Sequence, residues 1–311
     1  MKKVFLLFWI SWMMLFFTAC STQEQQYESQ LKIDMQKEIR EHLHVLCSEK
    51  MAGREGGTEG EAEAALYLAN FLKEKKLQPA GEEETFFQSF PIKGYMPRLG
   101  NKRMTYGLGN SFNQGTSENV LALLEGKTQE VIVVSAHYDH LGIINGQLYP
   151  GANDNASGVA VVLEIINALA DCRPERTILF AFWGSEEKGL LGSRYFCNNP
   201  TIPIEEIQGI VNFDTVGNLK EKKELLGWKV KENEATTEIV EKMAEDGWQI
   251  NWQNNSGHSS DHFSFSLKNI AGFTLLSPDW LEKNHTPLDE VKGIRISPMH
   301  DLVNLFINIL K

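Results

Sequence analysis

Six side chains that can bind a metal ion lie in five short segments of this chain, near the ends of predicted strands. They are His137, Asp154, Glu186, Glu187, Asp214 and His285. Imidazole and carboxylate groups are the ligands that zinc takes in catalytic sites. The number of groups suits two zinc ions, with one carboxylate left over to act as a base toward a metal-activated water.

Neighbouring residues suggest a role for the first two ligands. On an extended backbone, Asp139 lies on the same side as His137, where it can accept the second ring N–H and orient the imidazole. Asp154 lies in the small-residue segment G-A-N-D-N-A-S-G at 151–158. Since small neighbours let a carboxylate approach two cations at once, we assign Asp154 as the bridge between the metals.

Glu186 and Glu187 are adjacent, so on an extended segment they point to different sides. One can bind a metal while the other faces the substrate and moves protons. Two Zn²⁺ ions carry four positive charges, which Asp154, Glu187, Asp214 and a bridging hydroxide would balance. A nearly neutral cluster costs less to hold in a dry cleft than a charged one does.

Alternating apolar strands and helices must position these groups. Strands are predicted at 118–124, 131–136, 177–183, 207–213 and 271–276, and helices at 31–46, 59–76, 155–170, 234–246 and 297–310. This order indicates an α/β fold with a single domain, a three-layer α/β/α sandwich around a mixed, mainly parallel central sheet. Open sheets of this kind bind ligands beyond the carboxyl ends of their strands, where the six side chains fall.

The N-terminus has the pattern of an export signal. Two lysines precede an apolar run at 4–17, which is shorter than the roughly 20 residues that span a membrane. Residues 17–20 resemble a bacterial lipobox, which implies cleavage before a lipidated Cys20. We expect a signal peptide at 1–19, a polar tether at 20–30 and a zinc peptidase domain at 31–311, exported and lipid-anchored to a membrane of a bacterial cell envelope.

Composition excludes some alternatives. The net charge of −11 over 311 residues gives no basic footprint, so no nucleic-acid partner is expected. Beyond Cys20, three cysteines allow one disulfide at most, and no C-x-x-C pair suggests a metal site. We expect Cys47, Cys172 and Cys197 to be buried packing residues.

Several motifs together resemble the co-catalytic zinc exopeptidase family of the bacterial leucyl aminopeptidase type, to which the transferrin receptor ectodomain is related. They occur in family order and span most of residues 45–290: M-A-G-R (51–54), G-T-E-G (57–60), A-H-Y-D (136–139), G-A-N-D-N-A-S-G (151–158), S-E-E-K-G-L-L-G-S (185–193), N-F-D (212–214), S-D-H (260–262) and H-T-P (285–287).

The resemblance implies an aminopeptidase that hydrolyses N-terminal peptide bonds with two zinc ions per chain. His137, Asp154 and Asp214 would hold one zinc, and Asp154, Glu187 and His285 the other. Glu186 would be the general base, Asp139 would orient His137, and many members have a cis peptide bond after the bridging aspartate.

One position departs from the family. Asn284 replaces a tyrosine that steadies the tetrahedral intermediate in several members, so another donor or the second zinc must take that role. His140 is expected at the rim of the cleft rather than as a ligand. Asp261 and His262 are expected either to contact the substrate or to form a structural turn.

Two alternatives share the fold. Glutaminyl cyclases use a single zinc, and they typically have tryptophan before the last histidine, where this chain has Asn284. A receptor-like relative would keep the fold without the reaction, but such relatives lose ligands. Carboxypeptidase or deacylase activity on the same fold also stays open.

Overall fold

The computed structural model describes residues 29–92, 95–100, 103–108, 115–253 and 259–311. The chain divides into two units, Met1–Glu38 and Ile39–Lys311. In the first unit residues 29–38 are helical, while the predicted signal peptide and Cys20 lie outside the described residues. Among the described helices, none has the length and apolar character needed to cross a membrane. All of the described strands lie in the second unit.

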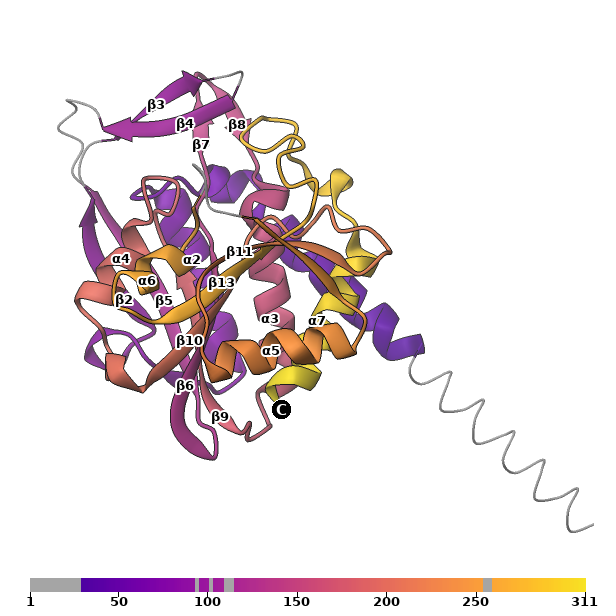
Figure 1. The fold of residues 1–311 in the computed structure, drawn as a ribbon. Helices are drawn as coiled ribbons and strands as arrows, with labels where there is room; N and C mark the ends of the chain where they lie inside the picture. The colour runs from indigo at the N-terminus through magenta and orange to yellow at the C-terminus, as the bar shows by residue number, and fades with distance from the viewer. Residues whose placement is uncertain (1–28, 93–94, 101–102, 109–114, 254–258) are drawn as a thin grey trace, which may run out of the picture. The chain divides into compact units, whose positions relative to one another are not determined.

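A nine-stranded sheet forms the centre of this unit (Figure 1). Its order is β1 (Gln78–Pro79), β5 (Gly115–Leu124), β9 (Arg176–Trp183), β6 (Thr128–His137), β10 (Ile207–Phe213), β13 (Ala271–Leu276), β11 (Glu224–Lys231) and β12 (Gln249–Gln253), with β2 (Phe87–Ile92) also paired to β5. Strands β9, β6, β10 and β13 run parallel, whereas β5 and β11 flank them in antiparallel pairing.

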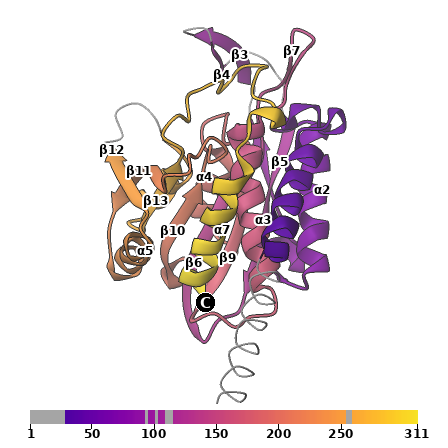
Figure 2. The same cartoon turned by 90° about the vertical axis from the view of Figure 1, so that its right-hand side faces the viewer.

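Helices cover both faces of the sheet, as the alternating pattern predicted. On one face lie the helical residues 39–46 with α2 (Glu59–Glu74), α3 (Ser157–Leu169), α5 (Glu234–Glu245) and α7 (Ile296–Leu310) (Figure 2). On the other lie α4 (Leu191–Asn198) and α6 (His262–Ser266). The central strands are buried on both faces, which explains why their sequences are apolar throughout.

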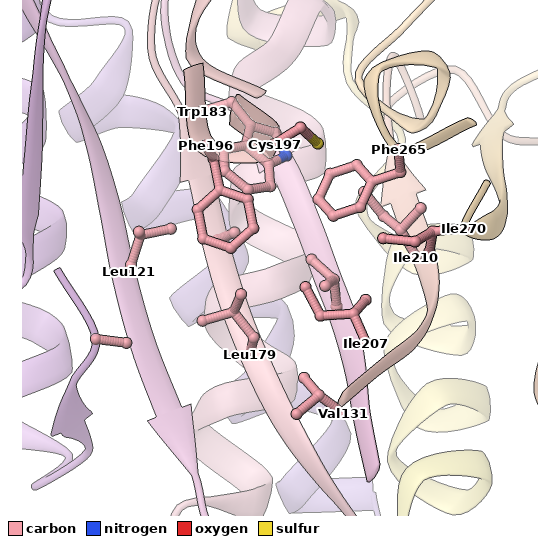
Figure 3. Close-up of a cluster of buried hydrophobic side chains, with 13 residues drawn as sticks. Leu121, Val131, Leu179, Trp183, Phe196, Cys197, Ile207, Ile210, Phe265 and Ile270 are labelled. Atoms are coloured by element: carbon pink, nitrogen blue, oxygen red, sulfur yellow. The ribbon is translucent and has the colours of Figure 1, made fainter. Parts of the chain in front are cut away.

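The core under α4 and α6 shows how the strands are oriented (Figure 3). Val131 and Val133 of β6 point into this cluster beside Leu179 of β9. Trp183 packs against Phe196 of α4 and Phe265 of α6, with ring centroids 5.4 and 5.8 Å apart. Burial of one such side chain contributes about 1.5–3 kcal/mol. The cluster therefore fixes the end of β9, three residues before Glu186.

Smaller elements complete the unit. Two hairpins form from β3 (Tyr95–Gly100) with β4 (Arg103–Leu108) and from β7 (Gly142–Ile144) with β8 (Gln147–Tyr149). Short helical turns are η1 (Glu49–Arg54), η2 (Glu82–Glu84), η3 (Ala152–Ala156), η4 (Ile204–Glu206) and η5 (Val291–Gly293). The three described cysteines are free. Of the three, Cys197 is buried, whereas Cys47 and Cys172 are partly exposed, so the expectation of three buried cysteines was wrong for these two.

Candidate metal centre

The structure brings all six predicted side chains to the wall of one cavity of about 860 Å³. His137 is the last residue of β6, and Asp214 directly follows β10. The two glutamates follow β9, and the loop after β13 carries His285. Because β6, β9, β10 and β13 are parallel, their carboxyl ends bring side chains from distant parts of the chain to one edge of the sheet.

One group of ligand atoms surrounds His137. Its Nε2 atom lies 3.4 Å from Asp154 Oδ1 and 3.7 Å from Asp214 Oδ1. The three side chains are buried and can present one ligand atom each to a single ion. We call this set the first metal position.

A second group lies on the other side of Asp154. His285 Nε2 is 3.0 Å from Asp154 Oδ2 and 3.1 Å from Glu187 Oε2. The two oxygens of the Asp154 carboxylate therefore face different groups, as the predicted bridge requires. We call the set around Glu187 and His285 the second metal position.

The separations fit zinc. Two ligands that are each about 2.0 Å from a tetrahedral ion lie ~3.3 Å apart. The four distances at the two positions run from 3.0 to 3.7 Å, around that value. Histidine and carboxylate donors at this spacing make both positions suitable for zinc.

His140 does not lie at the rim of the cleft, and that prediction was wrong. Its side chain is completely buried, and its Nδ1 atom lies 2.9 Å from Glu187 Oε1 and 3.9 Å from Asp154 Oδ2. His140, Asp154 and Glu187 form a second cluster that could hold an ion. The backbone N–H of His140 donates to the carbonyl of Arg54, which joins residue 140 to a distant loop.

Asp139 lies between His137 and the loop that carries Glu186 and Glu187. Its Oδ1 atom lies 3.6 Å from His137 Nδ1, on the side of the ring away from the metal position, so the expected hydrogen bond to this imidazole is not formed. The same carboxylate accepts the backbone N–H groups of Glu186 and Glu187, at 2.8 and 3.2 Å. Asp139 therefore orients the two glutamates by direct hydrogen bonds, a role that the spacing of H-Y-D did not suggest.

Asp289 is a buried residue of the site that the sequence did not reveal. Its two carboxylate oxygens accept the backbone N–H groups of Asn153 and Asp154, at 2.8 and 3.0 Å. The peptide bond between Asp154 and Asn155 is cis, as the family resemblance implied. The Asn155 side chain accepts N–H groups of Gly158 and Thr215 and donates to the carbonyl of Phe213.

The pKa values of Glu186 and Asp154 are shifted in opposite directions. Burial raises the pKa of Glu186 well above its usual value, and the negative charges of Glu187, Asp261 and Asp214 raise it further, against the effect of His137. Burial also acts on Asp154, but hydrogen bonds from His137 and His285 hold the pKa of this bridging carboxyl well below its usual range. Neighbouring carboxyl groups with opposite shifts are a mark of divided acid–base roles.

Glu61 supports the loop that carries Glu186. This buried carboxyl group accepts hydrogen bonds from the backbone of Ser185 and Gly57 and from the hydroxyl of Ser117, at 3.1, 2.6 and 2.7 Å. Burial raises its pKa to about 8, and the nearby charge of Asp139 adds to the shift. A neutral Glu61 is therefore the form that the folded protein favours near neutral pH.

Glu61→Gln is expected to change how stability depends on pH. Because the folded pKa of about 8 exceeds the usual 4.5, the contribution of Glu61 is fully present below pH 4.5 and is lost as pH rises through 8. Glutamine stays neutral at every pH. The melting temperature of the variant minus that of the wild type should therefore be more positive at pH 9 than at pH 5. Thermal unfolding across this range measures the difference, and the exposed Glu59→Gln is the control. If the melting temperatures of the wild type and Glu61→Gln changed with pH in the same way, the expectation would be contradicted.

Two further predicted residues do not line the cavity. Asp261 and His262 are both buried, and neither is among the residues that line it. His262 Nδ1 lies 2.7 Å from the hydroxyl of Thr274 on β13, and burial lowers the pKa of this histidine to about 3. Contact between these side chains and a substrate stays a prediction that the structure does not support.

Asn284 contacts the bridge directly. Its side-chain amide donates to Asp154 Oδ2 at 2.6 Å. The residue that replaces the family's tyrosine thus binds the oxygen that faces the second metal position. His285 is held in turn by a hydrogen bond between its Nδ1 atom and the carbonyl of Met104, at 2.7 Å.

The fold and this cluster together define a class of protein. An α/β/α sandwich with a shared aspartate, paired metal positions and a free glutamate at its sheet edge has the architecture of a co-catalytic metallopeptidase. A sequence profile for peptidase family M28 matches residues 119–310, well over half of the chain. The chain belongs to this family.

Relatives and solved structures agree with this assignment. Aminopeptidase YwaD of Bacillus subtilis (strain 168) is 30% identical over 211 residues, which are 62% of this chain and 44% of that protein. The chain thus spans less than half the length of this relative. An aminopeptidase from Aneurinibacillus sp. strain AM-1 has a similar structure, with a TM-score of 0.72 at 17% identity over 88% of this chain and 92% of that one.

Porphyromonas gingivalis glutaminyl cyclase also has this fold, with a TM-score of 0.65, 16% identity, and coverage of 88% of this chain and 96% of that one. An aminopeptidase and a cyclase therefore share the same architecture. The fold alone does not distinguish between the two activities, so the choice depends on the ligands.

Proposed function

We propose that this protein is an aminopeptidase that uses two zinc ions to hydrolyse N-terminal peptide bonds. The observation that carries the proposal is the Asp154 carboxylate, whose two oxygens face two separate groups of ligands. A free glutamate in the same cavity, Glu186, supplies the base that hydrolysis requires. The relation to aminopeptidase YwaD supports the same activity.

Zinc, when bound, would lower the pKa of a water molecule and polarise the scissile carbonyl group. Glu186 would accept the proton of that water and later deliver it to the leaving amine. Asp139 keeps the backbone of Glu186 in place through the hydrogen bond at 2.8 Å.

The walls of the cavity suit a peptide end with an apolar side chain. Leu190, Trp228, Trp280 and Leu281 line it together with the ligands. The Trp228 and Trp280 rings meet edge to face, with centroids 5.2 Å apart, and so form a firm apolar wall. Burial of an apolar side chain against this wall would contribute to substrate binding.

A digest of a peptide library tests the proposal. The protein is freed of metal, supplied with zinc, and incubated with peptides that vary at both ends, and the products are identified by mass spectrometry. We expect removal of single residues from the N-terminus and none from the C-terminus. C-terminal trimming, or conversion of N-terminal glutamine to pyroglutamate without other cleavage, would overturn the proposal.

A cyclotransferase is the nearest competing function, since a glutaminyl cyclase has this fold. A single-zinc cyclase would need only Asp154, Glu187 and His285. Here His137 and Asp214 complete a first metal position as well, because His137 Nε2 lies 3.4 Å from Asp154 Oδ1 and 3.7 Å from Asp214 Oδ1. Intact ligands at both positions likewise argue against a receptor-like relative without activity.

We also propose that residues 1–19 are a lipoprotein signal peptide, that 20–30 form a tether, that the peptidase domain is 31–311, and that Cys20 anchors the protein to a bacterial envelope membrane. The basic start, the apolar run and the lipobox-like F-T-A-C sequence support this. The mass of the mature N-terminus should show a lipidated Cys20, and Cys20→Ser should abolish lipidation and release the protein from membranes. An unmodified Cys20 in the mature chain would contradict the proposal.

A further inference from the structure

The imidazole of His140 is buried at the metal centre without a hydrogen-bond partner. The residue is 0% exposed, and both of its ring nitrogens lack a partner. Glu187 Oε1, 2.9 Å from His140 Nδ1, also lacks a hydrogen bond of acceptable geometry. Buried polar atoms are nearly always satisfied in folded proteins, so these two neighbouring atoms without an acceptable hydrogen bond point to a cation that both could bind.

The surrounding chain holds this imidazole in position. Gly151 packs against the ring so closely that an added Cβ atom would lie 2.5 Å from His140 Cγ and Cδ2. Gly151 also has a φ of +60°, which favours glycine. The Arg54 guanidinium donates to the carbonyls of Tyr138 and Gly151, at 2.7 and 2.9 Å, and thereby joins the segments that carry His140 and Asp154.

The two oxygens of Glu187 face two different imidazoles. Oε1 faces His140 at 2.9 Å and Oε2 faces His285 at 3.1 Å. The two rings themselves lie edge to face, with centroids 5.8 Å apart. Both histidines therefore contact the Glu187 carboxylate from different elements, one after β6 and the other after β13.

We propose that His140 is an additional protein ligand at the second metal position, beside Asp154, Glu187 and His285. This inference rests on the proposed two-metal function. It gives the second position four protein ligands, the number found in closed zinc sites, while the first keeps three and an open place for water. The two ions would then differ in affinity, and the second would be held more tightly.

A simpler role for His140 would be to orient Glu187 by a hydrogen bond, and the substitution His140→Asn separates the two roles. The introduced amide would lie near the place of Nδ1 and could donate to Glu187, but an amide is a poor zinc ligand. His140→Ala removes both functions. The exposed His44→Ala is the matched control, because it removes an imidazole far from the ligands in sequence and on the surface.

The test uses the full chain, stripped of metal, and measures zinc stoichiometry and both dissociation constants by competition with a chelator. We expect His140→Asn and His140→Ala each to weaken one of the two sites by more than about 100-fold, beyond the range for residues that only hydrogen-bond a ligand. The other site and the His44→Ala protein should keep wild-type affinities. Circular dichroism of the metal-free variants shows whether each one folds.

Wild-type affinity in a folded His140→Asn would overturn the ligand role and leave only a positioning role. A wild-type protein that binds one zinc would contradict the two-metal function instead. In that case His140→Asn still decides: loss of the single ion supports coordination by His140, and its retention excludes it.

Discussion

Glu186→Gln is expected to lower kcat by about 10²–10⁴-fold, the usual contribution of a general base. Glutamine keeps the size of the side chain but cannot accept the proton of the attacking water. The ligands are unchanged, and the Glu186 backbone N–H can still donate to Asp139. Zinc content, measured by elemental mass spectrometry, should therefore equal that of the wild type. Steady-state kinetics on the peptides cleaved in the library digest measures the loss.

The control for this substitution is Glu245→Gln, which changes an exposed glutamate of α5 in the same way. It should leave kcat unaltered. If Glu186→Gln retained wild-type kcat with both zinc ions bound, another group would have to be the base. If it lost zinc, Glu186 would have to be reassigned as a ligand.

Asp154→Asn is expected to remove both zinc ions rather than one. One carboxylate serves both positions, with Oδ1 toward His137 and Oδ2 toward His285. An amide carries no charge and binds zinc poorly, so both sites should lose zinc affinity together, by more than about 100-fold. Loss of a residue that only hydrogen-bonds a metal ligand already lowers metal affinity by about 10–100-fold. Peptidase activity should fall to background, and zinc per chain after dialysis should approach zero.

Asp214→Asn gives the matched comparison, because Asp214 approaches only the first metal position. It should release one ion and leave the other bound. Asp171→Asn makes the same aspartate-to-asparagine change at an exposed position after α3, and this control should keep both ions. Retention of two ions by Asp154→Asn would contradict the bridging role.

The central strands, and the gathering of the six candidate ligands at one cavity, could be predicted from the sequence for a common physical reason. Strands buried on both faces are continuously apolar, so β6, β9, β10 and β13 were visible as short hydrophobic runs. Parallel strands collect the polar residues that follow them at one edge, which is why ligands distant in sequence could be grouped before their positions were known. The predicted and observed strands agree because burial on both faces requires apolar residues, which are visible in a short stretch of sequence.

Other elements depend on contacts that no local pattern encodes. Strand β12 alternates partly buried and exposed residues at the end of the sheet, and the helices α4 and α6 are short. His140 was misjudged because its neighbours in sequence suggest a loop, whereas its inward position depends on Arg54 and Gly151. These contacts join residues that are far apart in the chain.

The same applies to the residues that support the site. Arg54 has a fully buried guanidinium that donates to four backbone carbonyls, those of Leu46, Tyr138, Pro150 and Gly151. Asp289 and Glu61 bind backbone N–H groups of the ligand loops. A buried charge needs such partners, but the sequence does not say which carbonyls or amides will supply them.

The segment 284–289 touches the bridge in three ways. His285 faces Asp154 Oδ2, Asn284 donates to that oxygen, and Asp289 binds the Asp154 backbone N–H. Release of this one segment would detach an imidazole and free the shared carboxylate at the same time. Binding of an ion at the second metal position and seating of this segment would therefore be thermodynamically coupled, so that an empty second position would favour release of the segment.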